Sequence, residues 1–161
     1  ASGNQDVNHL NEKYDGMVPD ILDNAFVIVD FENGVRAFLD ICMFAENSEF
    51  QEELCAVGST GKIETEVPSN KSGIASSDIR IGLREITTAF KETIAVDSKI
   101  LEAGHHHGST YYEHLSFIKA IRNNTKPEVS LNDGLIAVAI GEAAEISIKE
   151  GRVVQMSEFD L

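Results

Sequence analysis

Alternating apolar residues mark the first half of the chain as a series of strands. Residues 25–31 are rich in β-branched and aromatic side chains, and residues 35–44 place alternate apolar side chains on one face. Asn33 and Gly34 lie between the two segments, and both residue types tolerate a positive φ. The pattern therefore predicts a β-hairpin.

Further strands follow this hairpin. Residues 53–57 and 62–67 are strand-like and are separated by a short glycine-containing turn. The small polar residues of 68–77 predict a loop, and the apolar positions of 79–83 alternate again. Residues 93–96 predict one more strand. We expect this half of the chain to form a meander of mostly antiparallel strands.

The last third of the chain has helical spacing. Thr110 and Glu113 fit a capping box that opens a helix, and Asn123 with Asn124 predicts its end. The apolar stripe of this helix comprises Leu115, Phe117, Ile118 and Ile121.

A second helix is predicted behind the first. Ser130 is the expected N-cap, Asp133 favours the helix dipole, and Gly151 is in the usual position for ending the helix. Its apolar residues point one way and comprise Leu131, Leu135, Val138, Ala139 and Ile146. Val153 and Val154 predict a final edge strand.

Strands followed by two amphipathic helices predict the α+β class. We expect residues 1–161 to form a single domain, a large and mostly antiparallel sheet with the helices packed on one face. Two helices cannot cover both faces, so the other face meets water or another subunit. The large apolar residues on both faces of the hairpins favour a homo-oligomer, and they comprise Phe26, Phe31, Phe38 and Phe44.

Composition narrows the range of partners. The chain has 13 basic and 27 acidic residues, a net charge of −14, which disfavours nucleic acid and anionic membrane surfaces. Its hydrophobic fraction of 42% is typical of globular domains, and no apolar run approaches the ~20 residues of a membrane helix. Cys42 and Cys55 lie in apolar runs and are expected to be buried thiols in a reduced cytoplasmic protein, with a disulfide as the alternative.

Polar chemistry concentrates in residues 104–114, where three adjacent histidines, two tyrosines and His114 surround a predicted helix start. Backbone N–H groups at a helix start have no partner within the helix. This arrangement suits a hydroxyl-rich or anionic small molecule. A histidine here also has the chemistry for proton exchange, whereas the alternative is a loop whose imidazoles bond the backbone.

The sequence motifs of a metal site, a serine nucleophile and a dinucleotide site are not found in the chain. Consecutive histidines in an extended segment point to opposite sides, and the chain has neither His-Glu-x-x-His nor Cys-x-x-Cys, so we expect no bound metal. Ser109 and Ser116 are not part of a strand–turn–helix elbow. Without a Gly-x-Gly-x-x-Gly, a Walker motif or a parallel βαβ pattern, the chain by itself is not expected to hold a dinucleotide.

Several segments, taken in order, resemble one family. They are residues 19–25, 42–44, 57–64, 106–121, 127–134 and 151–152. Together they are similar to the C-terminal domain of the glucose–fructose oxidoreductase, inositol dehydrogenase and MocA-like (Gfo/Idh/MocA) oxidoreductases. The resemblance covers nearly the whole chain.

The resemblance implies part of an NAD(P)-dependent enzyme acting on a sugar, cyclitol or related polyol. In this family a Rossmann domain holds the cofactor, and the open face of the C-terminal sheet commonly forms the subunit interface. Substrate lies between the domains, near the start of the helix expected here at Thr110. His106, His107, Tyr111 and His114 are therefore the candidate substrate contacts.

The sequence lacks one domain and two motifs that belong to the family pattern. The Rossmann domain, the catalytic lysine of Glu-Lys-Pro and the Asp-x-x-x-His motif are absent, and His9 has no aspartate four residues before it. We therefore expect the chain alone to bind neither NAD nor NADP, to carry no catalytic residue and to be inactive. The alternatives are a stand-alone, non-enzymatic oligomeric binding module and a small metal-dependent enzyme.

Overall fold

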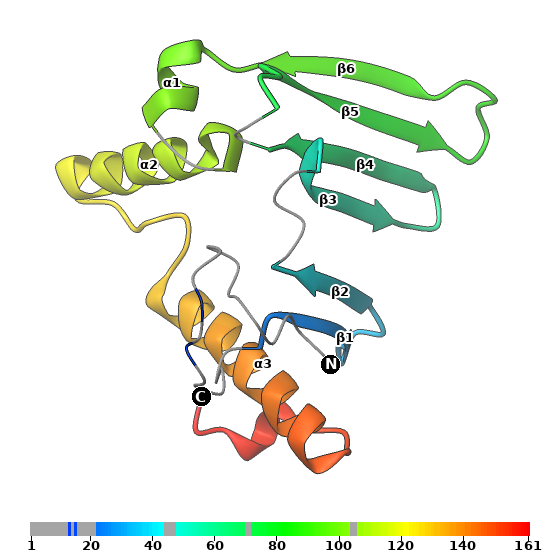
Figure 1. The fold of residues 1–161 in the computed structure, drawn as a ribbon, viewed down its shortest axis with the longest axis vertical. Coiled ribbons are helices and arrows are strands. Elements are labelled where there is room, and N and C mark those ends of the chain that lie inside the picture. Colours follow the sequence, from blue (N-terminus) through cyan, green and yellow to red (C-terminus); the bar gives the residue numbers. More distant parts are fainter. Residues whose placement is uncertain (1–12, 14, 16–21, 44–47, 70–71, 104–105) are drawn as a thin grey trace. The chain divides into compact units, whose positions relative to one another are not determined.

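The computed structural model describes residues 13, 15, 22–43, 48–69, 72–103 and 106–161. Two compact units divide the chain: the first unit comprises residues 1–44 and 126–161, and the second unit comprises residues 45–125. All strand pairs of the described residues are antiparallel, and they form a two-stranded sheet and a four-stranded sheet (Figure 1). With the accompanying helices, this composition confirms the predicted α+β class.

The first unit begins with the predicted hairpin. Strand β1 (Asn24–Asp30) pairs with β2 (Arg36–Cys42). The N–H of Phe31 donates to the carbonyl of Val35, and the N–H of Gly34 donates back to the carbonyl of Phe31, both at 2.9 Å. Gly34 has a φ of 83°, whereas Asn33 is not among the residues of positive φ. The turn is therefore a three-residue loop closed by a left-handed glycine, in which Asn33 instead accepts a bond from Val35 N–H at 3.0 Å.

The two faces of this hairpin differ in burial. On β1, Ala25 is buried and Val27 is half-buried, whereas Phe26 and Ile28 are exposed. Cross-strand pairing places Phe38 on the same face as Ile28. The rings of Phe26 and Phe38 stack there with centroids 5.9 Å apart. We call Phe26, Ile28 and Phe38 the aromatic face of the first unit.

Helix α3 (Leu131–Glu150) begins and ends as the sequence predicts. The hydroxyl of Ser130 accepts from Asp133 N–H at 3.2 Å, and Ser130 N–H donates to the Asp133 carboxylate at 2.8 Å. These two bonds form a capping box around Ser130, the predicted N-cap. The Ser130 hydroxyl also donates to the Asp133 carboxylate at 2.7 Å, and this bond together with the Ser130 N–H bond lowers the pKa of Asp133. Gly151 is the C-cap, and its N–H donates to the carbonyl of Ser147.

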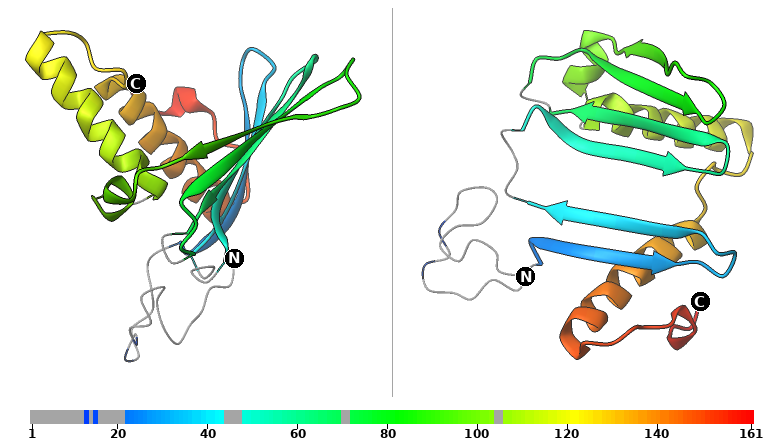
Figure 2. Two further views of the ribbon diagram at one scale, coloured as in Figure 1. Left: turned by 90° about the horizontal axis from the view of Figure 1, so that it is seen from above. Right: turned by 90° about the vertical axis from the view of Figure 1, so that its right-hand side faces the viewer.

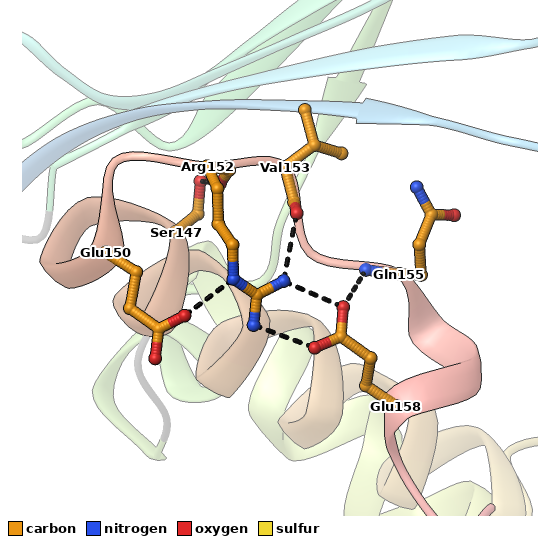
Figure 3. A network of polar contacts seen from close by, with 6 residues as sticks. All are labelled: Ser147, Glu150, Arg152, Val153, Gln155 and Glu158. Carbon is orange, nitrogen blue, oxygen red and sulfur yellow. Dashed lines mark hydrogen bonds and ion pairs between the residues drawn. The ribbon is translucent and has the colours of Figure 1, made fainter.

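The segment after α3 is held by one arginine rather than by strand pairing. Arg152 donates to Glu150 at 2.6 Å and to both carboxylate oxygens of Glu158 at 2.9 and 2.8 Å (Figure 3). Glu158 also accepts from Gln155 N–H at the start of the short turn η2 (Met156–Glu158). We call this group, with Ser147 and Val153, the Arg152 clasp. The predicted edge strand at Val153 and Val154 is wrong, because the clasp folds this segment on itself.

The second unit is built on strands that pair in chain order. They are β3 (Phe50–Val57), β4 (Gly61–Pro68), β5 (Ser76–Leu83) and β6 (Phe90–Ala95). Helices α1 (Ser98–Ala103) and α2 (Ser109–Asn123) lie on one side of this sheet (Figure 2). The sequence predicts α2 but not α1. Asn124 caps α2 in a left-handed conformation with a φ of 50°, which confirms the predicted stop.

One face of the four-stranded sheet is apolar and the other is charged. The strand register places Leu54, Ala56, Ile63, Thr65, Ile79 and Ile81 on the apolar face. On the opposite face, Arg80 donates to Glu66 at 2.8 Å, and Lys91 lies 2.7 Å from Asp78. These contacts join three neighbouring strands across the sheet.

Both cysteines are free and exposed, so the prediction of buried thiols is wrong. Cys55 pairs with Glu64 on the charged face, and Cys42 ends β2 on the side of the aromatic face. Strand alternation, rather than the apolar run itself, decides which way each thiol points. Within the described ranges, no helix combines the length and apolarity that crossing a membrane requires.

Candidate functional site

The predicted site centres on a strained turn between α1 and α2. This turn, η1 (His106–Gly108), has three consecutive residues of positive φ: 52° at His106, 55° at His107 and 87° at Gly108. Left-handed backbone is uncommon for residues with a Cβ, and strain of this kind clusters at functional positions. We call residues 106–108 the left-handed turn. Two adjacent histidines, His106 and His107, belong to this turn.

Close packing beneath the left-handed turn explains why Gly108 occupies its last position. Gly108 is buried, and a Cβ there would lie 2.8 Å from Ile100 Cγ2 and 3.3 Å from Val96 Cγ1. A side chain at this position would force the side chain of Ile100 to move. The contact between Gly108 and Ile100 therefore fixes where α2 begins.

The predicted capping box at Thr110 and Glu113 is wrong. Gly108 is the N-cap of α2, no side chain caps the helix, and Thr110 already lies within it. A serine or threonine N-cap needs extended backbone geometry, which the left-handed turn does not provide. The start of α2 is therefore fixed by packing rather than by a polar cap.

His107 is the most shielded of the candidate residues. Its ring is half-buried, and Nε2 is inaccessible to solvent and has no hydrogen-bond partner among the described residues. Burial lowers the pKa of His107 below its ordinary 6.5, so the ring is neutral at pH 7. An unpaired buried nitrogen costs about 1–3 kcal/mol, and such groups are commonly completed by a ligand or a water molecule.

His106 is paired with a residue that sequence reasoning misses. Its Nδ1 contacts the carboxylate oxygen Oε1 of Glu52, which lies on β3, 54 residues away in the chain. Both side chains are partly open to solvent. A partner so distant in the chain leaves no local sequence motif. The detectable signal is a glutamate, Glu52, in alternation with the apolar residues along one face of β3.

The other two candidates lie on α2. Tyr111 and His114 are three residues apart and thus share one side of the helix. Tyr111 is half-buried and contacts Tyr112 edge to face, with ring centroids 5.9 Å apart, whereas His114 is exposed. The structure thus places His106 and His107 in the left-handed turn and Tyr111 at the start of α2. His105 lies outside the described residues.

A pocket of about 490 Å³ occurs elsewhere, in the first unit. It lies between β1, α3 and the segment that follows α3, and its walls include Val27, Ala143 and Met156. None of the predicted site residues lines this pocket. We place the candidate site at the left-handed turn, because strain, an unpaired nitrogen and a histidine–carboxylate contact coincide there.

The described residues do not fit a metal or a dinucleotide. They contain no cluster of three histidine, cysteine, aspartate or glutamate side chains placed to hold an ion. A dinucleotide site needs a parallel strand–helix–strand unit with a glycine-rich turn, whereas every strand pair described is antiparallel. The imidazole, phenol and carboxylate groups of the candidate site can donate and accept hydrogen bonds.

These features define an α+β domain whose polar site lies at the start of a helix beside an antiparallel sheet. Residues 2–156 match the oxidoreductase family, C-terminal alpha/beta domain, of the Gfo/Idh/MocA type. The chain belongs to this family, which confirms the resemblance seen in the sequence. A search of curated proteins finds no match.

Proposed function

We propose that the chain supplies substrate contacts and the subunit interface in an NAD(P)-dependent oxidoreductase that acts on a sugar, cyclitol or related polyol. Membership of an oxidoreductase family supports the enzyme context. The observation that carries the choice of substrate is the left-handed turn, in which His106 and His107 are consecutive residues of a strained backbone.

Neutral imidazoles suit hydroxyl groups. A neutral ring has one N–H donor and one bare nitrogen acceptor, and a hydroxyl can satisfy either. The lowered pKa of His107 keeps this ring in the neutral form at pH 7. Tyr111 adds a phenol that both donates and accepts. Neighbouring hydroxyls of a polyol would bond these groups together, with His114 as the outermost contact.

The hydride step belongs to a nucleotide-binding domain in this proposal. NAD or NADP would supply the hydride acceptor there, and the present chain would bind and orient the polyol. By itself the chain would be inactive.

The aromatic face of the first unit is the proposed subunit interface. Phe26 is 74% exposed and Phe38 is 64% exposed, and their stacked rings form a preassembled apolar surface. A second copy of the chain, related by a two-fold axis, would cover both rings at once.

Nuclear magnetic resonance of the 161-residue chain tests substrate binding. We expect a panel of myo-inositol, glucose and xylitol to shift the His106 and His107 ring signals. Tyr111→Phe should weaken this response, and the adjacent Tyr112→Phe is the matched control. NADH added alone should release no binding heat in calorimetry. The proposal fails if no polyol of the panel shifts either ring, or if NADH binds tightly.

A further inference from the structure

Glu52 occupies an unusual place on the sheet of the second unit. It pairs with Val67 and lies on the same face of β3 as Leu54 and Ala56, which is the apolar face. The side chain of Glu52 is 38% exposed. A partly buried carboxylate among apolar neighbours needs a hydrogen-bonding partner to offset its lost hydration. His106 is that partner.

The backbone of β3 is irregular at this point. The register between β3 and β4 shifts between Phe50 and Glu52, so one extra residue is accommodated in β3. A bulge of this kind bends the strand and changes the direction of the side chain beside it, and bulges are frequent next to active sites. Two independent backbone irregularities, the bulge and the left-handed turn, thus flank one side-chain contact.

The contact determines which nitrogen of His106 carries a proton. An ionised carboxylate only accepts hydrogen bonds, so the contact with Glu52 Oε1 favours His106 Nδ1 as the donor. In the neutral ring, the bare acceptor is then Nε2. Within the described ranges no residue bonds Nε2, and the His106 side chain is 51% exposed. The acceptor nitrogen is therefore available to a ligand.

We propose that Glu52 is a positioning residue, which holds His106 in the Nδ1–H form and presents Nε2 to accept a hydrogen bond from a substrate hydroxyl. This inference rests on the proposed function for the identity of the ligand. The contact of Glu52 with His106 stands independently of it. The observed contact places Glu52 Oε1 on Nδ1, the ring nitrogen opposite the one proposed to bond the polyol.

The first measurement needs no ligand. Long-range ¹H–¹⁵N spectra distinguish the two neutral forms of a histidine ring. We expect His106 in the wild-type chain to be protonated at Nδ1, and Glu52→Ala to give a mixture of both forms. Glu52→Gln keeps the size and one acceptor oxygen, and we expect an intermediate result. Glu53→Ala is the matched control, because the neighbouring carboxylate lies on the opposite face of β3.

The second measurement is polyol binding by the same variants. Loss of one oriented acceptor should weaken binding about tenfold in Glu52→Ala, with Glu53→Ala unchanged. An unchanged His106 ring in both folded Glu52 variants would overturn the positioning role. So would altered ring protonation with unaltered polyol affinity. Absence of polyol binding in the wild-type chain would instead overturn the proposed function, and the tautomer would still report whether Glu52 orients His106.

Discussion

Gly108 joins the left-handed turn to α2, and it has two reasons to be glycine. Its φ is 87°, and a Cβ would lie 2.8 Å from Ile100 Cγ2. We expect Gly108→Ala to lower the free energy of unfolding by about 2–3 kcal/mol, since backbone strain and steric overlap add. Urea denaturation followed by circular dichroism measures this loss.

Gly73→Ala separates the two contributions. Gly73 also has a positive φ, 72°, but a Cβ there would meet nothing within 4 Å. We expect a loss of about 1 kcal/mol from backbone strain alone. Equal losses in the two variants would contradict the packing of Gly108 against Ile100.

Glu158 makes the Arg152 clasp sensitive to acid. Its bonds with Arg152 and with Gln155 N–H lower the pKa of Glu158 from 4.5 to about 2. A lowered carboxyl pKa stabilises the fold above pH 4.5, and this stabilisation is lost as the pH falls toward 2. As the pH falls from 4.5 toward 2, we therefore expect the urea concentration at the midpoint of unfolding to fall in the wild-type chain. In Glu158→Gln it should fall less steeply.

A carboxyl titration by nuclear magnetic resonance checks the cause directly. Glu158 should titrate near pH 2 in the wild-type chain and closer to 4.5 in Arg152→Gln. Glu142→Gln, at an exposed position on α3, is the control for the loss of one negative charge. Parallel acid profiles for wild type and Glu158→Gln would refute the coupling.

The two long helices begin by different physical means. Ser130 caps α3 through reciprocal bonds with Asp133, whereas α2 begins without a side-chain cap. We expect Ser130→Ala to destabilise the chain by about 1 kcal/mol and Thr110→Ala to have almost no effect. Thermal unfolding of the two variants measures the difference. A comparable loss of stability in Thr110→Ala would indicate that Thr110 does cap α2, contrary to the structure.

Local chemistry explains which elements the sequence predicts. The hairpin at Gly34 and both ends of α3 depend on residues within a few positions of one another, and all three are predicted correctly. The start of α2 depends on Gly108 against α1, and the orientation of His106 depends on Glu52, 54 residues away. Contacts between separate segments leave no periodic pattern in the sequence. The sequence therefore identifies the histidines as candidates but does not predict the residues that pack against them or bond them.

Assembly of the molecule is testable through the aromatic face. Phe38→Glu places a charge where the proposed two-fold contact buries stacked rings. We expect this variant to elute as a monomer in size-exclusion chromatography with light scattering, and the wild-type chain to elute as a dimer or larger oligomer.

Val35→Glu is the matched control for this change. Val35 is exposed in the hairpin turn, outside the aromatic face, and should leave the oligomer intact. Circular dichroism would verify that both variants fold. A monomeric wild-type chain, or dissociation by both substitutions alike, would rule out the aromatic face as the interface.

At the left-handed turn, selection for stability and selection for substrate binding favour different residues. Glycine at position 106 or 107 would relieve about 1 kcal/mol of backbone strain at each site, while removing an imidazole. A variant library screened only for heat resistance should therefore accumulate glycine or asparagine at these two positions. Under the proposed function, growth that depends on polyol oxidation by an enzyme containing this chain should restore histidine at both positions.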